Sequence, residues 1–112
     1  MIYAVQSNVV RIDPRVYGGS DGYLPGVEKD EIQWRAFFQR SGITTLESAR
    51  ETTKRRFGYL IQKLADKAQA GDLAIIQHSG HGTQQRDQDG DEEDGLDKLL
   101  CMFDGTLADD MV

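Results

Sequence analysis

The 112-residue chain has one cysteine, two prolines and one tryptophan, and it has no long apolar run. A single cysteine excludes an internal disulfide and a zinc cluster built from cysteines. No apolar stretch approaches the roughly 18 residues that a membrane-spanning helix needs. The N-terminus lacks a basic region followed by a long apolar stretch, so no signal peptide is evident. We therefore expect one globular domain in a reducing, cytoplasmic setting.

Acidic residues are concentrated at the C-terminal end. Residues 1–86 contain 12 Lys and Arg against 9 Asp and Glu, a balance of +3. Residues 87–112 contain one base, Lys98, and 10 acids, a balance of −9. A surface of this charge disfavours nucleic acid and anionic membranes as partners, and it suits a cation or a cationic peptide.

Apolar periodicity predicts the secondary structure. The clearest helical stripe consists of Phe57, Leu60, Ile61, Leu64, Ala65 and Ala68. Thr52 or Thr53 can cap this helix, and Gly71 closes it. In chain order we expect a strand over 2–10, a Gly- and Pro-rich loop over 11–26, a helix over 28–40, a strand over 43–46, a helix over 54–70 and strands over 73–76 and 99–103. This alternation predicts an α/β fold with a mostly parallel sheet and helices on its faces. In such a sheet, 73–76 would be buried on both faces.

His81 is the strongest candidate for chemistry. It follows the strand expected over 73–76, and functional sites in open α/β sheets gather beyond the C-terminal ends of strands. The glycines on either side, Gly80 and Gly82, let backbone amides approach a ligand closely. A histidine placed in this way suits a general base or the activator of a nucleophile. The alternative is an ordinary loop histidine between turn glycines.

Three further residues carry weaker signals. His78 lies three positions before His81, but no third nitrogen or sulfur ligand is near, so the pair does not predict a zinc site and His78 is expected in a strand. Cys101 lies within an apolar run with no adjacent base, so we expect a buried structural cysteine. Asp30 lies on the first helix, where an acidic residue usually only favours the helix dipole.

The tract over 87–97 has seven carboxylates in 11 residues. It does not fit an EF-hand loop. Counted from Asp87, the sixth position should be glycine and is Glu92, and the twelfth should be glutamate and is Lys98. A divalent ion held in another geometry would relieve the repulsion between these carboxylates. A solvated acidic loop is the alternative.

The string His-Ser-Gly-His-Gly at 78–82, followed by Asp-Gly-Asp-Glu-Glu-Asp-Gly at 89–95, resembles the metacaspases. These are caspase-like cysteine peptidases whose bacterial members are often called orthocaspases. Ser-Gly-His-Gly alone is shared with related peptidases, and the acidic run makes the resemblance specific. It continues upstream in Ala-Gly-Asp at 70–72 and Leu-Pro-Gly-Val-Glu-Lys-Asp at 24–30, and so spans nearly the whole chain.

The resemblance implies a caspase-like α/β fold and a cysteine endopeptidase that cleaves after Arg or Lys. His81 would be the catalytic histidine, Gly82 would give its N–H to the oxyanion hole, and Asp30 would line the S1 pocket. In calcium-activated members, a calcium site is formed at the positions matched by Asp97, Asp109 and Asp110.

The chain departs from this family in its nucleophile. The family cysteine stands in an Asp-x-Cys-His-Ser-Gly context, which the 112 residues do not contain. Counting about 50 residues from His81, the spacing found in caspases, passes the last residue. Cys101 is not followed by His-Ser-Gly and is not assigned as the nucleophile.

We therefore interpret residues 1–112 as the N-terminal, His-bearing portion of a caspase-like catalytic domain that is inactive alone. It would need a second polypeptide or a further segment carrying the cysteine, and it should expose an apolar sheet edge toward that partner. A fragment, a truncated form and a natural pseudo-enzyme all agree with the sequence. The alternative function is a catalytically inactive calcium-binding or pseudo-protease interaction module.

Overall fold

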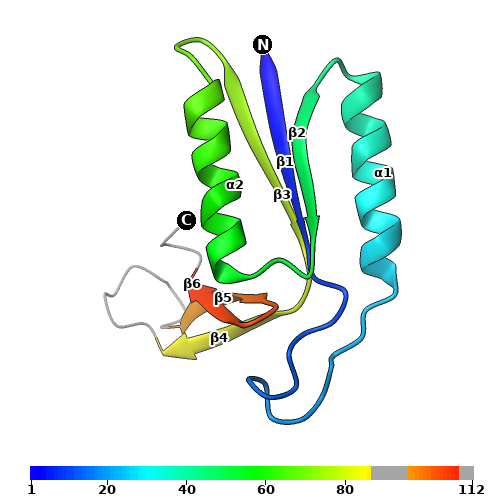
Figure 1. Cartoon of the computed structure of the whole chain (residues 1–112), viewed down its shortest axis with the longest axis vertical. Coiled ribbons are helices and arrows are strands. Elements are labelled where there is room, and N and C mark those ends of the chain that lie inside the picture. The colour runs from blue at the N-terminus through cyan, green and yellow to red at the C-terminus, as the bar shows by residue number, and fades with distance from the viewer. Residues whose placement is uncertain (87–95, 109–112) are drawn as a thin grey trace.

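The computed structural model describes residues 1–86 and 96–108, which form two helices and six strands (Figure 1). In chain order these are β1 (Ile2–Asn8), α1 (Gly26–Arg40), β2 (Thr44–Arg50), α2 (Lys54–Lys67), β3 (Leu73–Ser79), β4 (Gly82–Arg86), β5 (Leu96–Met102) and β6 (Gly105–Ala108). Most of the acidic tract, 87–95, lies outside the described residues, as do Asp109 and Asp110. No described helix is both long and apolar enough to cross a membrane.

The first sheet is parallel and has the strand order β2-β1-β3. The two helices lie on its two sides, as Figure 1 shows. This arrangement confirms the predicted α/β class with a parallel sheet between helices. Because the strands run in the same direction, their carboxyl ends meet at one edge, where the chain passes into the second sheet.

Side chains of the central strand β1 alternate between the two helices. On the α2 side, Tyr3 and Val5 pack with Leu60, Leu64 and Ala49 in the main hydrophobic cluster. On the α1 side, the buried residues are polar toward the carboxyl end of the strand, where Gln6 and Asn8 donate hydrogen bonds to Glu31 of α1. The main apolar cluster is therefore on the α2 side of the sheet, and α1 contributes the buried side chains of Val27 and Phe38 on the other side.

Helix α2 is shorter than predicted. It ends at Lys67, since Ala68 is already extended with φ −74° and ψ 137°, and Gly71 lies in the following turn with φ +90°. Thr53 is the N-cap and accepts a hydrogen bond from the Arg56 amide at 3.1 Å. Ala65, which the sequence placed on the apolar stripe of this helix, is exposed.

Strand β3 is not buried on both faces, contrary to the prediction. Leu73 and Ile76 are 55% and 39% exposed. The reason is that β3 forms one edge of the described parallel sheet and pairs with β1 alone. On α1, Trp34 and Phe37 are likewise exposed, whereas their neighbour Phe38 is buried. Strand β2 continues to Arg50, four residues beyond the predicted end.

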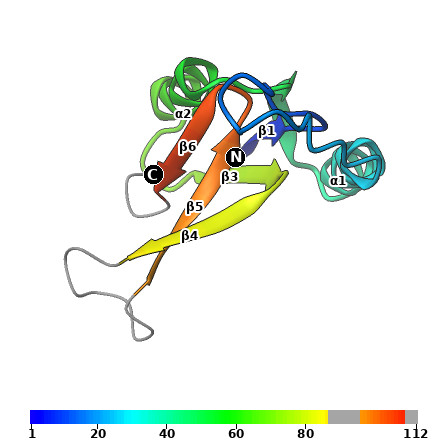
Figure 2. The same cartoon turned by 90° about the horizontal axis from the view of Figure 1, so that it is seen from below.

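The second sheet is antiparallel with the order β4-β5-β6 and lies below the carboxyl ends of the parallel strands (Figures 1 and 2). The sequence indicated only the run 99–103, most of which falls in β5. The polar strand β4 and the short strand β6 carry no strong apolar pattern, so the prediction missed both. A hydrogen bond from the Cys101 amide to the His81 carbonyl, 3.0 Å long, ties this sheet to the chain that leaves β3.

Candidate functional site

His81 lies between the two sheets, two residues after β3 and immediately before β4. Its ring Nε2 is 2.7 Å from the carbonyl oxygen of Gly22, and the side chain is partly buried. A carbonyl oxygen can only accept, so Nε2 carries the proton in this contact. In the neutral imidazole, Nδ1 is then the unprotonated nitrogen and is available to accept a proton.

Gly22 belongs to the long loop that joins β1 to α1. Its φ of +55° favours glycine, and a Cβ built there would lie 2.9 Å from His81 Nε2 and 3.0 Å from the side chain of Ile12. A glycine is therefore required for the carbonyl to approach the imidazole. The sequence predicted a Gly-rich loop here, but nothing in its composition distinguished Gly22 from Gly18 or Gly19.

Hydrogen bonds between the outgoing and returning arms of this loop, residues 10–12 and 21–24, bring Gly22 to His81. The Ile12 amide donates to the Asp21 carbonyl and the Leu24 amide donates to the Val10 carbonyl, both at 2.8 Å. The outgoing and returning segments therefore run beside each other. These contacts join residues 9 and 14 positions apart in sequence and have no periodic signature.

His78 has a different environment, inside β3. Its Nδ1 lies 3.0 Å from the Ser7 hydroxyl oxygen and its ring packs edge-on against Phe57. Nε2 is buried and has no hydrogen-bond partner within the described part of the chain, and burial lowers the pKa of the ring. The expectation of a strand residue is confirmed. Among the described residues, no three His, Cys, Asp or Glu side chains form a group that could hold a metal ion.

Cys101 is 5% exposed, in agreement with the predicted structural role. Burial raises the pKa of its thiol, which disfavours the thiolate form. The neighbouring Tyr17 donates its hydroxyl to the Met102 carbonyl at 2.7 Å, and desolvation raises the pKa of this phenol to about 12. Among the described residues, none that lies beside Cys101 activates it as a nucleophile.

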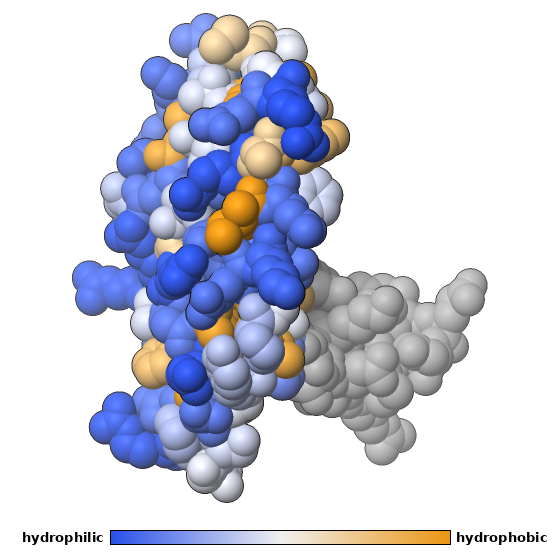
Figure 3. Space-filling model, turned by 90° about the vertical axis from the view of Figure 1, so that its right-hand side faces the viewer, coloured by the Kyte–Doolittle hydropathy of each residue, from blue (hydrophilic) through white to orange (hydrophobic). Residues whose placement is uncertain are grey.

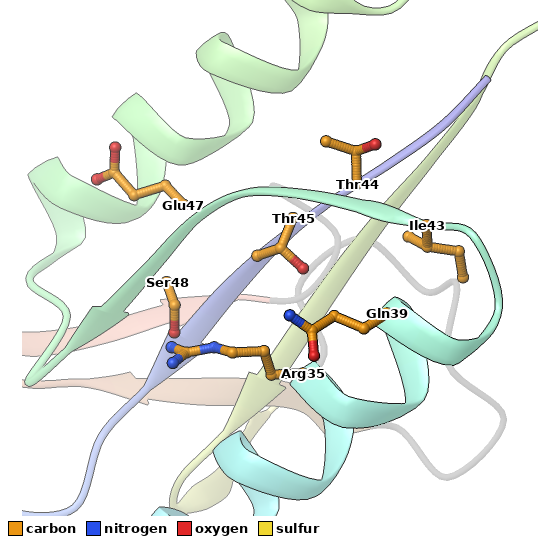
Figure 4. A pocket seen from close by; sticks show the side chains of 7 residues that line it. All are labelled: Arg35, Gln39, Ile43, Thr44, Thr45, Glu47 and Ser48. Atoms are coloured by element: carbon orange, nitrogen blue, oxygen red, sulfur yellow. The ribbon is translucent and has the colours of Figure 1, made fainter.

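Asp30 is exposed on α1. It shares a helical row with Trp34 and Phe37, at i, i+4 and i+7. The opposite side of the helix borders β2 across a polar groove of about 430 Å³ (Figure 4). The groove is lined by Arg35, Gln39, Ile43, Thr44, Thr45, Glu47 and Ser48. The row that contains Asp30 therefore lies on the side of α1 away from β2.

The remaining predicted site residues lie in the second sheet or beyond the described part. Gly82 is the first residue of β4 and pairs with Leu100. Asp97 lies on β5, opposite Gln85. Asp109 and Asp110 fall outside the described residues, so the structure does not place the three predicted calcium ligands together.

Glu31 is a buried charged residue that the sequence analysis did not single out. Its carboxylate accepts hydrogen bonds from Asn8 and Ser48 at 3.1 and 2.8 Å, and it forms an ion pair with Arg50 at 2.9 Å. Burial opposes ionisation, but the bonds from Arg50 and Ser48 outweigh it and lower the pKa of Glu31. The cluster joins α1 to the carboxyl ends of β1 and β2.

Comparison with known proteins agrees with this arrangement. A family model described as "Metacaspase, peptidase C14 domain" matches residues 30–112. Metacaspase-1A of Neurospora crassa is 36% identical over 111 residues, covering 86% of this chain and 24% of the relative. Metacaspase-1 of Arabidopsis thaliana is 38% identical over 64 residues, covering 54% of this chain and 17% of the relative.

A solved structure is similar over nearly the whole chain. Protein GSU0716 from Geobacter sulfurreducens aligns with a TM-score of 0.81 and 32% identity, covering 97% of this chain and 42% of that one. The present chain thus spans less than half of the solved relative and about a quarter or less of the two curated ones. With the family model matching well over half of its residues, this chain belongs to the metacaspase family of peptidase C14 domains.

Proposed function

We propose that this chain is the His-bearing part of a caspase-like cysteine endopeptidase, with His81 as the catalytic base. The observation that carries the proposal is the 2.7 Å contact between His81 Nε2 and the Gly22 carbonyl. This contact leaves Nδ1 to take the proton from a cysteine thiol and later to deliver it to the leaving amine. The backbone N–H of Gly82, one residue away, is proposed to stabilise the oxyanion.

The nucleophilic cysteine is proposed to come from a second polypeptide or a further segment that packs along β3. Two observations support this place. The outer edge of β3 is unpaired within the described residues, and Leu73 and Ile76 are exposed there. The side of the molecule on which α1 lies is mostly hydrophilic with scattered hydrophobic areas (Figure 3), although α1 also exposes Ile32, Trp34 and Phe37. Apolar surface along an open sheet edge favours strand addition.

Asp30 is proposed to select Arg or Lys in the substrate. Its exposed carboxylate lies on the side of α1 away from β2, and so toward the side where the partner segment would pack. A carboxylate in a partly enclosed pocket binds a guanidinium or ammonium group through charge-assisted hydrogen bonds. Replacing it should therefore weaken the preference for basic side chains.

The test begins with the native protein, purified with whatever polypeptide carries the cysteine and identified by intact mass. Cleavage of fluorogenic peptides with Arg, Lys or Asp before the scissile bond gives rate and selectivity. His81→Gln should remove about 99% of the rate or more, since a positioned acid–base group contributes about 10²–10⁴-fold. Asp30→Asn should lower the Arg-to-Asp selectivity at a similar folded content. Wild-type rate in the first variant would refute the role of His81.

Absence of any cysteine-bearing polypeptide in the native protein would favour the second candidate, a pseudo-protease that binds a partner through the β3 edge. The observation favouring this candidate is that Cys101, the one cysteine in the 112 residues, is buried and has a raised pKa.

Calcium is proposed as a ligand of the acidic C-terminal region. Leu99 of β5 pairs with Ala108 of β6. In the sequence, Asp97 lies two residues before Leu99, and Asp109 directly follows Ala108. When bound, the ion would neutralise the repulsion among Asp97, Asp109 and Asp110. Calorimetry should detect heat with millimolar calcium that Asp97→Ala abolishes and the exposed control Asp66→Ala retains. No heat in the wild type would contradict the proposal.

A further inference from the structure

Glu51 has an unusual backbone conformation at the carboxyl end of β2. Its φ is 49°, and it is the one residue other than glycine with positive φ in the part of the chain that the structure describes. This conformation is unfavourable for a residue with a Cβ, so the surrounding contacts must offset its cost. Backbone strain of this kind clusters at active sites, ligand clamps and switch regions.

The Glu51 carboxylate binds the backbone where the loop leaves β1. Oε1 accepts hydrogen bonds from the Val10 and Arg11 amides at 2.7 and 3.0 Å, and Oε2 also lies 3.0 Å from the Arg11 amide. Hydrogen bonds to an ionised carboxylate are stronger than those between neutral groups. The strained conformation of Glu51 is thus coupled to a fixed position for Val10 and Arg11, near the start of the loop.

That arm determines where Gly22 lies. The Val10 carbonyl accepts from Leu24, and the Ile12 amide donates to Asp21, so these two hydrogen bonds enclose Gly22 on the returning arm. The Gly22 carbonyl in turn contacts His81 Nε2. A continuous series of short contacts therefore runs from the Glu51 carboxylate to the imidazole.

We propose that Glu51 is a positioning residue for His81. By anchoring the loop at Val10 and Arg11, it holds the Gly22 carbonyl where it keeps the proton on Nε2 and leaves Nδ1 as the base. The consequence for catalysis rests on the proposed function of His81, whereas the coupling between Glu51 and the imidazole does not. Without the anchor, the loop would move away and the ring would exchange between its two neutral tautomers.

A matched control is available in the same pocket. A cavity of about 220 Å³ is lined by Val10, Arg11, Glu28, Arg50 and Glu51. Glu28 therefore presents a second carboxylate to the same surroundings, but among the described residues it makes no hydrogen bond to the loop. Glu28→Gln removes one charge from the pocket and leaves the anchor in place.

The experiment uses ¹⁵N-labelled protein at a pH where the imidazole is neutral. Long-range ¹H–¹⁵N spectra report which ring nitrogen of His81 is protonated. The wild type and Glu28→Gln should show separate resonances with the proton on Nε2. In Glu51→Gly, the two ring resonances should move toward each other, and the Val10 and Arg11 amides should exchange with solvent about tenfold faster or more. Glycine also relieves the positive φ, which favours a folded variant.

Glu51→Gln provides a second measurement if the glycine variant does not fold. It retains the shape of the side chain but exchanges the carboxylate for a neutral, weaker acceptor, so it should shift the ring resonances in the same direction by a smaller amount. A folded Glu51 variant with the wild-type His81 spectrum would overturn the proposal. If the spectra change as expected but His81→Gln leaves cleavage intact, the positioning stands and the proposed function of His81 fails.

Discussion

At the scale of single residues, the contact between Gly22 and His81 leads to a sharp prediction. Gly22→Ala places a methyl group 2.9 Å from Nε2 on a backbone with φ +55°. We expect the variant to lose about 1–3 kcal/mol of unfolding free energy and to move the His81 ring resonances. Denaturant unfolding and NMR measure the two effects.

Substitutions at two other glycines serve as controls that distinguish backbone strain from the steric contact with His81. Gly18 also has positive φ, +84°, but a Cβ there would meet none of the described atoms within 4 Å, and Gly26 has neither feature. Gly18→Ala should therefore cost stability without changing His81, and Gly26→Ala should be nearly neutral. Equal His81 shifts in Gly18→Ala and Gly22→Ala would show that the methyl contact is not the cause.

His78 makes folding sensitive to mild acid. Burial lowers its pKa in the folded chain, so folding favours the neutral ring. The unfolded state then binds more protons below about pH 6.5, and stability present above this pH is lost as the pH falls. For one titrating group, the unfolding free energy changes by at most about 1.4 kcal/mol per pH unit. Denaturant midpoints between pH 7.5 and 5 measure it.

His78→Gln should remove this slope above about pH 5. The carboxylates with lowered pKa values, Glu31, Asp13 and Asp72, act in the same direction, but their contributions are lost at lower pH, below their unfolded values of about 4. An unchanged slope in the variant would assign the effect to another group.

The residues of the site could be predicted from the sequence only where a motif or a burial pattern marks them. His81 follows from its place between glycines after a strand, and the buried Cys101 follows from its apolar neighbours. Gly22 and Glu51 were missed because their contacts are between the main chain and side chains of distant residues. Such contacts produce neither a regular spacing nor a biased composition in the sequence.

At the scale of elements, a threonine side chain caps the N-terminus of α2. Thr53 accepts from the Arg56 amide, whereas Thr52 is buried and its hydroxyl faces the Asn8 carbonyl at 3.5 Å. Thr53→Ala should cost about 1 kcal/mol of stability, the usual value for an N-cap. The exposed strand residue Thr44 provides the control, since Thr44→Ala should change the unfolding midpoint little. Equal effects of both variants would exclude the capping role.

Helix α2 was predictable because burial of one face against the sheet imposes a period on its sequence. The central strand β1 is buried almost throughout, and it was predictable from the apolar, β-rich run at 2–10. Strands β4 and β6 are short and pair locally, so they need no apolar run. The exposure of β3 could not be inferred, because an apolar strand has the same sequence whether or not its neighbour is present.

At the scale of the whole molecule, the open edge of β3 predicts how the chain associates. Ile76 is 39% exposed on this edge strand, while Tyr59 on α2 is 50% exposed away from the edge. A lysine in place of Ile76 should oppose strand addition, because charged edge residues resist pairing. Tyr59→Lys introduces the same charge at a site of similar exposure and serves as the matched control.

Sedimentation of each variant, alone and with the cysteine-bearing polypeptide, measures the effect. Burying the 39% of Ile76 that is exposed contributes only about 0.6–1.2 kcal/mol. Burying a lysine charge adds a further cost, so Ile76→Lys should weaken association by about tenfold or more. Tyr59→Lys should bind as the wild type does. If Ile76→Lys binds as tightly as the wild type, the partner packs elsewhere, and the proposed supply of the nucleophile along β3 is wrong.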